Sequence, residues 1–124
     1  MTTDPEYVFV YGTLKKGFGN HRLLAEAEYV GPACVKGHLI SLGGFPGLIY
    51  NPHEVTQGEV YRVTSATQWE RLDRLEGFNK EAPSAGSNMY LRRSITTIDT
   101  NQDCEVYYWN GGKDAGPAVT NNTW

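Results

Sequence analysis

The 124-residue sequence has few cysteines, no basic excess and no long apolar run, and each shortage excludes a class of protein. With Cys34 and Cys104 as its only cysteines, it lacks the disulfide framework of small secreted domains, and we expect two reduced, buried thiols. Its formal net charge is −3, whereas a nucleic-acid-binding protein is expected to carry a basic excess. No stretch reaches the ~18 apolar residues of a membrane-spanning helix, and residues 1–6 do not resemble a signal peptide. These shortages predict a cytoplasmic protein that binds neither nucleic acid nor membrane.

The sequence also offers little support for a metal site or a nucleophilic side chain. The three histidines have no metal-ligand spacing with one another, with the cysteines or with carboxylates. We therefore expect no metal. No serine nucleophile elbow is present. Cys34 and His38 would share one face of a strand, which leaves a cysteine hydrolase as an alternative.

What the chain does contain is a series of short segments rich in β-branched and aromatic residues. They predict strands over residues 7–11, 33–42, 57–63, 90–98 and 104–109. Gly37 interrupts the second of these, where a bulge or close packing is expected. A short helix is expected over residues 21–29.

One helix has clear boundaries. Ser65 can cap a helix over residues 65–76, Gln68 completes a capping box, and Gly77 favours a stop. Many strands with one good helix predict an α+β fold built on a curled mixed sheet or small barrel. We expect a single domain over residues 1–124, with a core of residues 7–109 and a weakly ordered tail in which Trp124 could still dock.

The first predicted strand runs into a glycine-rich loop, FVYGTLKKGFGNH, from Phe9 to His21. Gly12 and Gly17 have the spacing of a phosphate-binding loop, but Phe18 stands where lysine is required. A glycine directly after a strand lets backbone N–H groups approach a ligand, and such amides can hold a carboxylate or an oxyanion. A plain strand-to-loop turn explains the same residues, so both interpretations stay open.

Glu76 has an unusual position on the predicted helix. At about 100° per residue it falls on the same face as Trp69 and Leu72, the face expected to meet the core. Burial and the negative end of the helix dipole both favour the protonated carboxyl there, and the raised pKa suits a general acid or base. Alternatively, Glu76 turns to solvent or pairs with Arg92 or Arg93.

Four motifs follow one another along the chain. They are Tyr11-Gly12-Thr13-Leu14, Gly58-Glu59-Val60-Tyr61, Leu72-Asp73-Arg74-Leu75-Glu76-Gly77 and Tyr90-Leu91-Arg92. In this order they resemble the gamma-glutamylcyclotransferase-like family, in particular its AIG2-like branch. The stretch VYGTLKKG…NH is similar to the gamma-glutamylamine cyclotransferase members, and the resemblance covers about residues 7–109.

The resemblance implies a small mixed β-barrel with flanking helices and a pocket at the barrel mouth. It implies that Glu76 is the catalytic base, that Tyr90 lines the pocket, and that residues 45–48 form a proline-containing wall. The γ-glutamyl group of the substrate would be bound by the backbone amides of Tyr11, Gly12, Thr13 and Leu14. The loop at 77–89 has its own sequence, so the motifs leave the leaving-group amine unassigned, as they do the oligomeric state.

The implied reaction converts a small γ-glutamyl amide or γ-glutamylamine to 5-oxoproline and a free amine, without metal or cofactor. The substrate supplies its own nucleophile, the α-amine, so the lack of a nucleophilic side chain is consistent with it. The alternative is a module of the same fold that binds a small molecule without turnover. In the enzyme, Glu76 would point into a cavity beside Gly12, whereas in the binding module it would be salt-bridged or face solvent.

Overall fold

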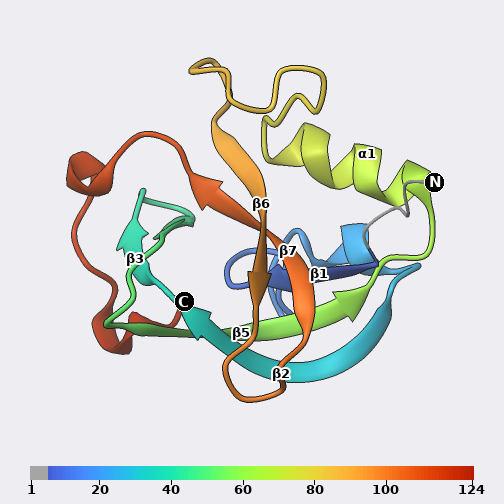
Figure 1. Cartoon of the computed structure of the whole chain (residues 1–124), viewed down its shortest axis with the longest axis horizontal. Coiled ribbons are helices and arrows are strands. Elements are labelled where there is room, and N and C mark those ends of the chain that lie inside the picture. Colours follow the sequence, from blue (N-terminus) through green and yellow to red (C-terminus); the bar gives the residue numbers. More distant parts are fainter. Residues whose placement is uncertain (1–5) are drawn as a thin grey trace.

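The computed structural model describes residues 6–124, whose strands form one curled, mixed sheet (Figure 1). The strands are β1 (Tyr7–Val10), β2 (Glu28–Lys36), β3 (His38–Ser41), β4 (Pro46–Ile49), β5 (Val55–Arg62), β6 (Tyr90–Thr96) and β7 (Asp103–Trp109). The helix α1 spans Ala66–Leu75, and three 3-10 turns are η1 (His21–Leu24), η2 (Lys113–Ala115) and η3 (Thr120–Asn122). The α+β class predicted from the sequence is confirmed.

The strand order is β2-β5-β1-β7-β4-β3, and β6 pairs with β7 outside this path. β6 runs antiparallel along the whole of β7 and so occupies one of its edges. The parallel strands β1 and β4 must therefore share the other edge, β1 opposite Glu105 and β4 opposite Tyr108. β1 and β4 therefore pair with different parts of β7. The candidate site lies between the end of β1 and the start of β4.

The sheet does not close into the small barrel that the resemblance implies. β2 and β3 are consecutive in the chain but lie at opposite ends of the strand order. The free edge of β3 is instead occupied by the C-terminal segment, because the Ser41 N–H donates to the Pro117 carbonyl and the Val119 N–H to the Leu39 carbonyl. This edge of β3 is thus covered by the C-terminal segment and not by β2.

Residues 110–124 are therefore integrated into the fold, and the prediction of a weakly ordered tail is wrong. Asn122 anchors them: its side-chain N–H groups donate to the Gly37 carbonyl at 2.7 Å and to Thr56 Oγ1 at 2.9 Å. Its Oδ1 accepts from the Leu39 N–H at 2.6 Å. Trp124 packs against a buried cluster, and Figure 1 shows this segment, in red, running around β3.

Buried side chains form two clusters because successive residues of a strand point to opposite faces of the sheet. Val8 and Val10 of β1 pack in one cluster with Leu72 of α1. Phe9, between them, packs in the other with Leu39 of β3. One face of β1 is thus fixed against the helix, which places the last turn of α1 near the end of β1.

The ends of α1 agree with the prediction, with one difference in the cap. The Ser65 hydroxyl accepts from the Gln68 N–H at 3.2 Å, and Gly77 has a φ of +64°, a conformation that glycine adopts readily. The Gln68 carboxamide oxygen accepts from the Thr64 N–H at 2.8 Å, whereas a capping box would use the N–H of Ser65 itself.

The predicted helix over residues 21–29 is only partly present. η1 covers its first part, but Glu28 and Tyr29 belong to β2, in which Tyr29 pairs with Tyr61 of β5. The long antiparallel pairing of β2 with β5 outweighs the local preference for helix. The predicted strand over residues 33–42 is two strands separated by Gly37, which packs so closely that a Cβ there would lie 2.5 Å from Leu48 Cδ1.

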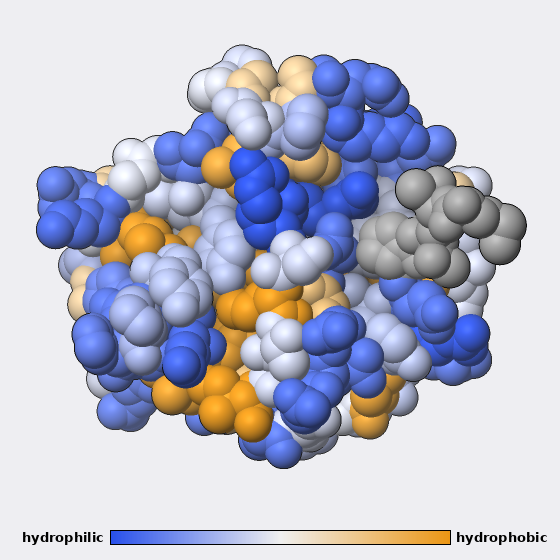
Figure 2. All heavy atoms as spheres, viewed as in Figure 1, coloured by the Kyte–Doolittle hydropathy of each residue, from blue (hydrophilic) through white to orange (hydrophobic). Residues whose placement is uncertain are grey.

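The outward face of α1 is charged, with Glu70, Arg71 and Arg74 exposed. Figure 2 shows the molecule from the same side as Figure 1. Hydrophilic residues cover most of this face, and apolar residues are exposed in a band below its centre. Within residues 6–124, no helix has the length and apolar character needed to cross a bilayer.

Candidate active site

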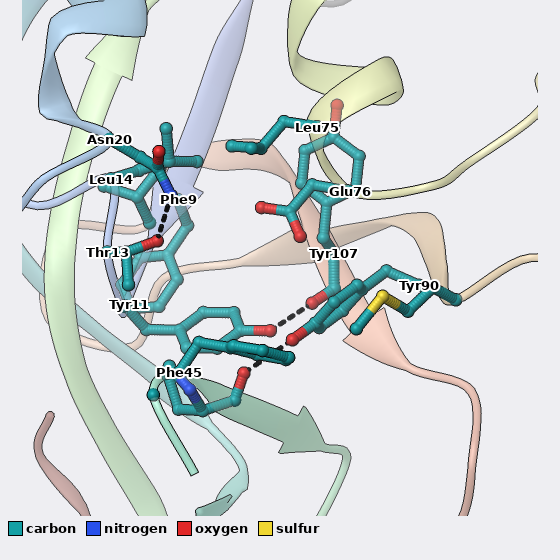
Figure 3. A pocket seen from close by; sticks show the side chains of 15 residues that line it. Phe9, Tyr11, Thr13, Leu14, Asn20, Phe45, Leu75, Glu76, Tyr90 and Tyr107 are labelled. Atoms are coloured by element: carbon teal, nitrogen blue, oxygen red, sulfur yellow. Dashed lines mark hydrogen bonds between the residues drawn. The ribbon is translucent and has the colours of Figure 1, made fainter. Parts of the chain in front are cut away.

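A cavity of about 360 Å³ lies at the end of β1, bounded by the end of α1 and by the turn that leads into β4 (Figure 3). Its lining includes every site residue predicted from the sequence: Tyr11, Gly12, Thr13, Leu14, Glu76 and Tyr90. Residues from distant parts of the chain therefore meet at one place.

The Glu76 carboxylate is the charged group of this cavity. Glu76 is the residue that follows α1, and Figure 3 shows its carboxylate pointing into the cavity, toward Tyr11 and Tyr107. Burial raises the pKa of Glu76 to about 7, and within residues 6–124 no hydrogen bond or ion pair to this carboxylate opposes that shift. Glu76 can therefore exchange a proton near neutral pH.

Asp73, one helical turn earlier, is bound on several sides. Its carboxylate accepts from Arg92 Nη1, with both oxygens at 2.9 Å, and from the Tyr107 hydroxyl at 2.6 Å. The Arg92 guanidinium lies over the rings of Trp69 and Phe78, at 5.0 and 5.4 Å from their centres. This network fixes α1 to β6 and β7.

The same network bears on one of the alternatives for Glu76, an ion pair with Arg92 or Arg93. Arg92 is engaged by Asp73 and, at 3.5 Å, by Glu105. Arg93 donates to the Pro83 carbonyl at 3.2 Å. Neither arginine pairs with Glu76, so that alternative is wrong.

Three tyrosines shape the wall of the cavity, and each uses its hydroxyl to fix the structure. The Tyr11 hydroxyl donates to the Tyr107 carbonyl of β7 and accepts from the Leu48 N–H of β4 at 3.3 Å. The Tyr11 hydroxyl therefore links the end of β1 to both β7 and β4. The Tyr90 hydroxyl donates to the Pro46 carbonyl at 2.7 Å. Burial raises the pKa of Tyr11, Tyr90 and Tyr107 above the ordinary value, so these phenols are neutral at neutral pH.

The loop after β1 lines the cavity and has backbone amides without a hydrogen-bond partner in the described part of the chain. Among the hydrogen bonds between residues 6–124, none has the N–H of Gly12, Thr13 or Leu14 as its donor. These residues line the cavity, so their N–H groups are available to a ligand. Successive free amides are suited to a carboxylate or an oxyanion.

Asn20 and Pro46 hold this loop in place. Asn20 donates from Nδ2 to Thr13 Oγ1 at 2.8 Å, and its N–H donates to the Thr13 carbonyl at 3.0 Å. A Cβ on Gly12 would lie 2.7 Å from Pro46 Cγ. Glycine is therefore required here for close packing against Pro46, the first residue of β4, a reason in addition to the approach of a ligand.

Two residues of the site, Asn20 and Tyr107, have no role in the sequence-based prediction. Asn20 stands within the glycine-rich stretch, where an asparagine is also typical of a simple turn. Tyr107 is one of several aromatic residues in a strand, and only the pairing of β7 with β1 and β6 brings it to the cavity. Neither could be distinguished by a local pattern.

The alternative of a cysteine hydrolase gains no support. The Cys34 N–H donates to Asp99 Oδ1 at 3.1 Å, and His38 Nδ1 lies 3.1 Å from Glu54 Oε1. Burial raises the pKa of the Cys34 thiol, whereas a reactive cysteine needs a lowered one. Both cysteines are free; Cys104 is buried and Cys34 is partly exposed. In the described part of the chain, no group of at least three His, Cys, Asp or Glu residues could hold a metal ion.

Comparisons with known proteins agree with this geometry. The family described as "Gamma-glutamyl cyclotransferase, AIG2-like" matches residues 8–124. The gamma-L-glutamyl-butirosin B gamma-glutamyl cyclotransferase of Niallia circulans is 38% identical over 73 residues, which cover 57% of this chain and 46% of that protein. The gamma-glutamylaminecyclotransferase of Mus musculus is 28% identical over 125 residues, which cover 91% of this chain and 72% of that protein. The crystal structure of an AIG2-like protein from Mus musculus superposes with a TM-score of 0.74 at 25% identity, covering 98% of this chain and 89% of that one.

Proposed function

The chain belongs to the gamma-glutamyl cyclotransferase, AIG2-like family, and from this membership we propose that it converts a γ-glutamyl amide or γ-glutamylamine to 5-oxoproline and the free amine. Its relatives indicate a gamma-glutamylcyclotransferase-like activity. The matched residues of this chain span less than half of the Niallia circulans relative.

One observation carries the proposal. An unpaired carboxylate, Glu76, faces a cavity that is also lined by Gly12, Thr13 and Leu14, whose N–H groups donate no hydrogen bond within residues 6–124. A binding protein has no need of a buried carboxylate without a partner, because its desolvation is unfavourable. A carboxylate that acts as a general base with a pKa near 7, by contrast, has to be buried and without a partner.

In the proposed reaction, Glu76 removes a proton from the α-ammonium of the substrate. The freed α-amine attacks the γ-carbonyl carbon, and a new C–N bond closes the five-membered ring. Glu76 donates its proton to the leaving nitrogen and the original C–N bond breaks. Glu76 then takes the second proton from the ring nitrogen and passes it to the released amine, which leaves as an ammonium ion. Attack by a group of the same molecule has a large effective molarity when the substrate is held in a folded conformation. The wall formed by Tyr11, Tyr90 and Tyr107 would hold the substrate in that conformation.

The loop after β1 supplies the remaining requirement, stabilisation of negative charge. The N–H groups of Gly12, Thr13 and Leu14 can donate to the substrate α-carboxylate or to the oxyanion of the tetrahedral intermediate. Asn20 and Pro46 keep these donors fixed before the substrate arrives, so that little reorganisation is needed during the reaction.

The proposal is tested by measuring 5-oxoproline release from a panel of γ-glutamyl amino acids and γ-glutamyl amines. Wild type should release 5-oxoproline from at least one substrate, and Glu76→Gln should be slower by about 10²-fold or more. Thermal unfolding of Glu76→Gln checks that the fold is intact. Release at equal rates by both proteins would contradict the role of Glu76, and no release from any substrate would favour a module that only binds.

A further inference from the structure

Among the described residues that line the cavity, none is lysine, arginine or histidine, and Glu76 is the only carboxylate. Figure 3 shows Thr13 and Leu14 on the opposite side of the cavity from Glu76. An anionic group of a ligand would therefore depend on uncharged N–H donors. How well these donors are oriented and polarised then decides how strongly they bind it.

The Thr13 N–H is the end of a chain of hydrogen bonds that begins at His21. His21 Nδ1 lies 3.0 Å from the Leu14 carbonyl oxygen, and because a carbonyl can only accept, Nδ1 carries the proton and donates it. The Leu14 carbonyl shares its peptide group with the Lys15 N–H, which donates to the Gly12 carbonyl at 3.0 Å. The Gly12 carbonyl shares its peptide group with the Thr13 N–H. The chain thus runs through two peptide groups to a residue of the cavity wall.

A second chain of hydrogen bonds leads to the Leu14 N–H from Arg22, which like the first donor lies on η1. Arg22 Nη1 donates to the Gly19 carbonyl at 2.6 Å. The N–H of that peptide group belongs to Asn20, and it donates to the Thr13 carbonyl at 3.0 Å. The Thr13 carbonyl shares its peptide group with the Leu14 N–H. Two neighbouring residues of η1 therefore lead, by separate chains, to two neighbouring N–H groups of the cavity wall.

Hydrogen bonds that are linked through peptide groups strengthen one another. When a carbonyl accepts a hydrogen bond, the N–H of the same peptide group becomes a better donor, by about 10–30% per bond. Arg22 also places a permanent positive charge at the start of its chain. The same bonds fix the orientation of the peptide groups, so the donors are in place before a ligand arrives.

The next peptide group of the loop belongs to a chain that leads elsewhere. The Lys15 carbonyl accepts from the Phe18 N–H at 3.0 Å, and the Lys16 N–H donates to Glu59 Oε1 at 2.9 Å. This chain ends on a carboxylate of β5 that does not line the cavity. The two chains that begin on η1 differ from it, because each ends at an N–H without a partner in the described part of the chain.

The His21 ring is itself held in place. It lies 5.7 Å from the ring of Tyr61, a buried residue of β5, at an interplanar angle of 58°. The His21 N–H donates to the Phe18 carbonyl at 3.1 Å. The orientation of Nδ1 toward the loop is therefore fixed by contacts outside the cavity.

We propose that His21 and Arg22 are positioning residues for the reaction, and that each acts through two peptide groups on one N–H that binds the anionic part of the substrate. His21 orients and polarises the Thr13 N–H, and Arg22 does the same for the Leu14 N–H. Neither side chain touches the substrate. This inference rests on the proposed function, in which these amides hold the α-carboxylate or the oxyanion of the tetrahedral intermediate.

Two pairs of variants separate the chains. His21→Phe keeps a ring against Tyr61 and removes the donor, whereas His21→Asn keeps a nitrogen on Cγ that can donate from about the same place. Arg22→Met removes the donor and its charge, whereas Arg22→Lys keeps both. Arg22 is exposed, so its variants should fold even if His21→Phe does not.

The amide signals of the protein without substrate, measured by ¹H–¹⁵N NMR, test the chains independently of activity. His21→Phe should move the Thr13 amide proton upfield and leave that of Leu14 nearly unchanged. Arg22→Met should move the Leu14 amide proton upfield and leave that of Thr13 nearly unchanged. His21→Asn and Arg22→Lys should keep both signals near their wild-type positions. A role of these residues in the fold alone would not produce this crossed pattern.

The kinetic test uses a γ-glutamyl substrate from which wild type releases 5-oxoproline. Removing a donor to an oxyanion lowers kcat by about 10²–10³-fold; here the donor stays but is weakened, so we expect smaller effects. His21→Phe should lower kcat/KM by about tenfold, and Arg22→Met, whose hydrogen bond is exposed, by about threefold. His21→Asn and Arg22→Lys should stay within about twofold of wild type.

The outcomes distinguish the positioning role from the reaction. The crossed pattern of amide shifts, together with a loss of kcat/KM that His21→Asn restores, would support the proposal. Equal shifts of Thr13 and Leu14 in both variants, or an unchanged kcat/KM in His21→Phe, would overturn it while 5-oxoproline release still upheld the reaction. Equal losses of kcat/KM in His21→Phe and His21→Asn would also overturn it. No release by wild type from any substrate would overturn both the reaction and the positioning role.

Discussion

The end of α1 holds two carboxyl groups whose surroundings differ in almost every respect. Asp73 lies in a closed region, where Arg92 and Tyr107 donate to it. Glu76 lies at the open cavity, and within residues 6–124 no donor reaches its side chain. Burial raises the pKa of both groups, but at Asp73 the two donors oppose the shift, whereas at Glu76 burial acts alone.

The contacts of Asp73 also explain why Glu76 has no counter-ion. Arg92 is a partly buried cation on the strand that carries Tyr90, and without Asp73 it would be a candidate partner for Glu76. By binding Arg92 and Tyr107, Asp73 fixes α1 in place and leaves Glu76 without a counter-ion. A structural carboxylate and a chemically available one can thus stand a single turn apart.

The largest effect is expected from Asp73→Asn, which removes the nearer of the two carboxylates that pair with Arg92 and leaves only Glu105 at 3.5 Å. Breaking a buried ion pair by removing one partner costs about 3 kcal/mol or more, because the other charge stays buried. Urea unfolding should show this loss. The freed cation should also lower the pKa of Glu76 and move the acid limb of the pH–rate profile to lower pH.

The double variant Asp73→Asn/Arg92→Met is the control for Asp73→Asn. It removes both charges, so it should recover part of the stability and return the acid limb toward its wild-type position. A loss of stability in Asp73→Asn without any shift in the acid limb would contradict the electrostatic link between the two regions.

The next largest effect is the change in the free energy of unfolding that Glu76→Gln should cause. The folded state raises the pKa of Glu76 from 4.5 to about 7, so it binds more protons than the unfolded state between these values. The contribution of Glu76 to the free energy of unfolding is therefore fully present below about pH 4.5. It is lost as the pH rises through 7. Glu76→Gln should be more stable than wild type by about 1–3 kcal/mol at pH 8, and equal to it at pH 4. A less stable variant at pH 8 would mean that the carboxylate has a favourable partner.

Tyr107→Phe tests the donor shared between the regions. It removes the hydroxyl that donates to Asp73 at 2.6 Å, and a hydrogen bond to a charged group contributes about 1.5–3 kcal/mol. Tyr108→Phe, at the next position of β7, is the control and should change stability by less than about 0.5 kcal/mol. Similar losses in the two variants would contradict a specific role for the Tyr107 hydroxyl.

The smallest effect is expected from Asn20→Ala in the binding loop. The variant loses the 2.8 Å hydrogen bond to Thr13 Oγ1, and the loop amides become less well placed. Stability should fall by about 1 kcal/mol or less, whereas KM should rise several-fold. If stability falls and KM is unchanged, Asn20 supports the fold alone.

Local patterns in the sequence predict the elements that frame the site. Ser65 and Gly77 mark the ends of α1, and the spacing of Trp69, Leu72 and Glu76 places the carboxylate on the inner face. The apolar run before Gly12 predicts β1. These features depend on residues close together in the chain, for which capping and periodicity are sufficient.

Features set by distant pairing could not be predicted in this way. The partner of Arg92 depends on the register of β6 with β7 and on where α1 packs, so the sequence could not decide whether Arg92 pairs with Asp73 or with Glu76. The extension of β2 back to Glu28 depends on β5. The order of the C-terminal segment depends on Asn122, whose hydrogen-bonding partners lie far from it in the chain.

The difference between the two carboxyl groups can be measured by titrating the side-chain carboxyl of Glu76 by ¹³C NMR, with the signal assigned from its absence in Glu76→Gln. The structure predicts a pKa of about 7, in the range that a general base needs at neutral pH. A pKa near the ordinary value of 4.5 or below it would show a solvated or paired carboxylate, and would contradict both the isolation of Glu76 and its proposed role as the base.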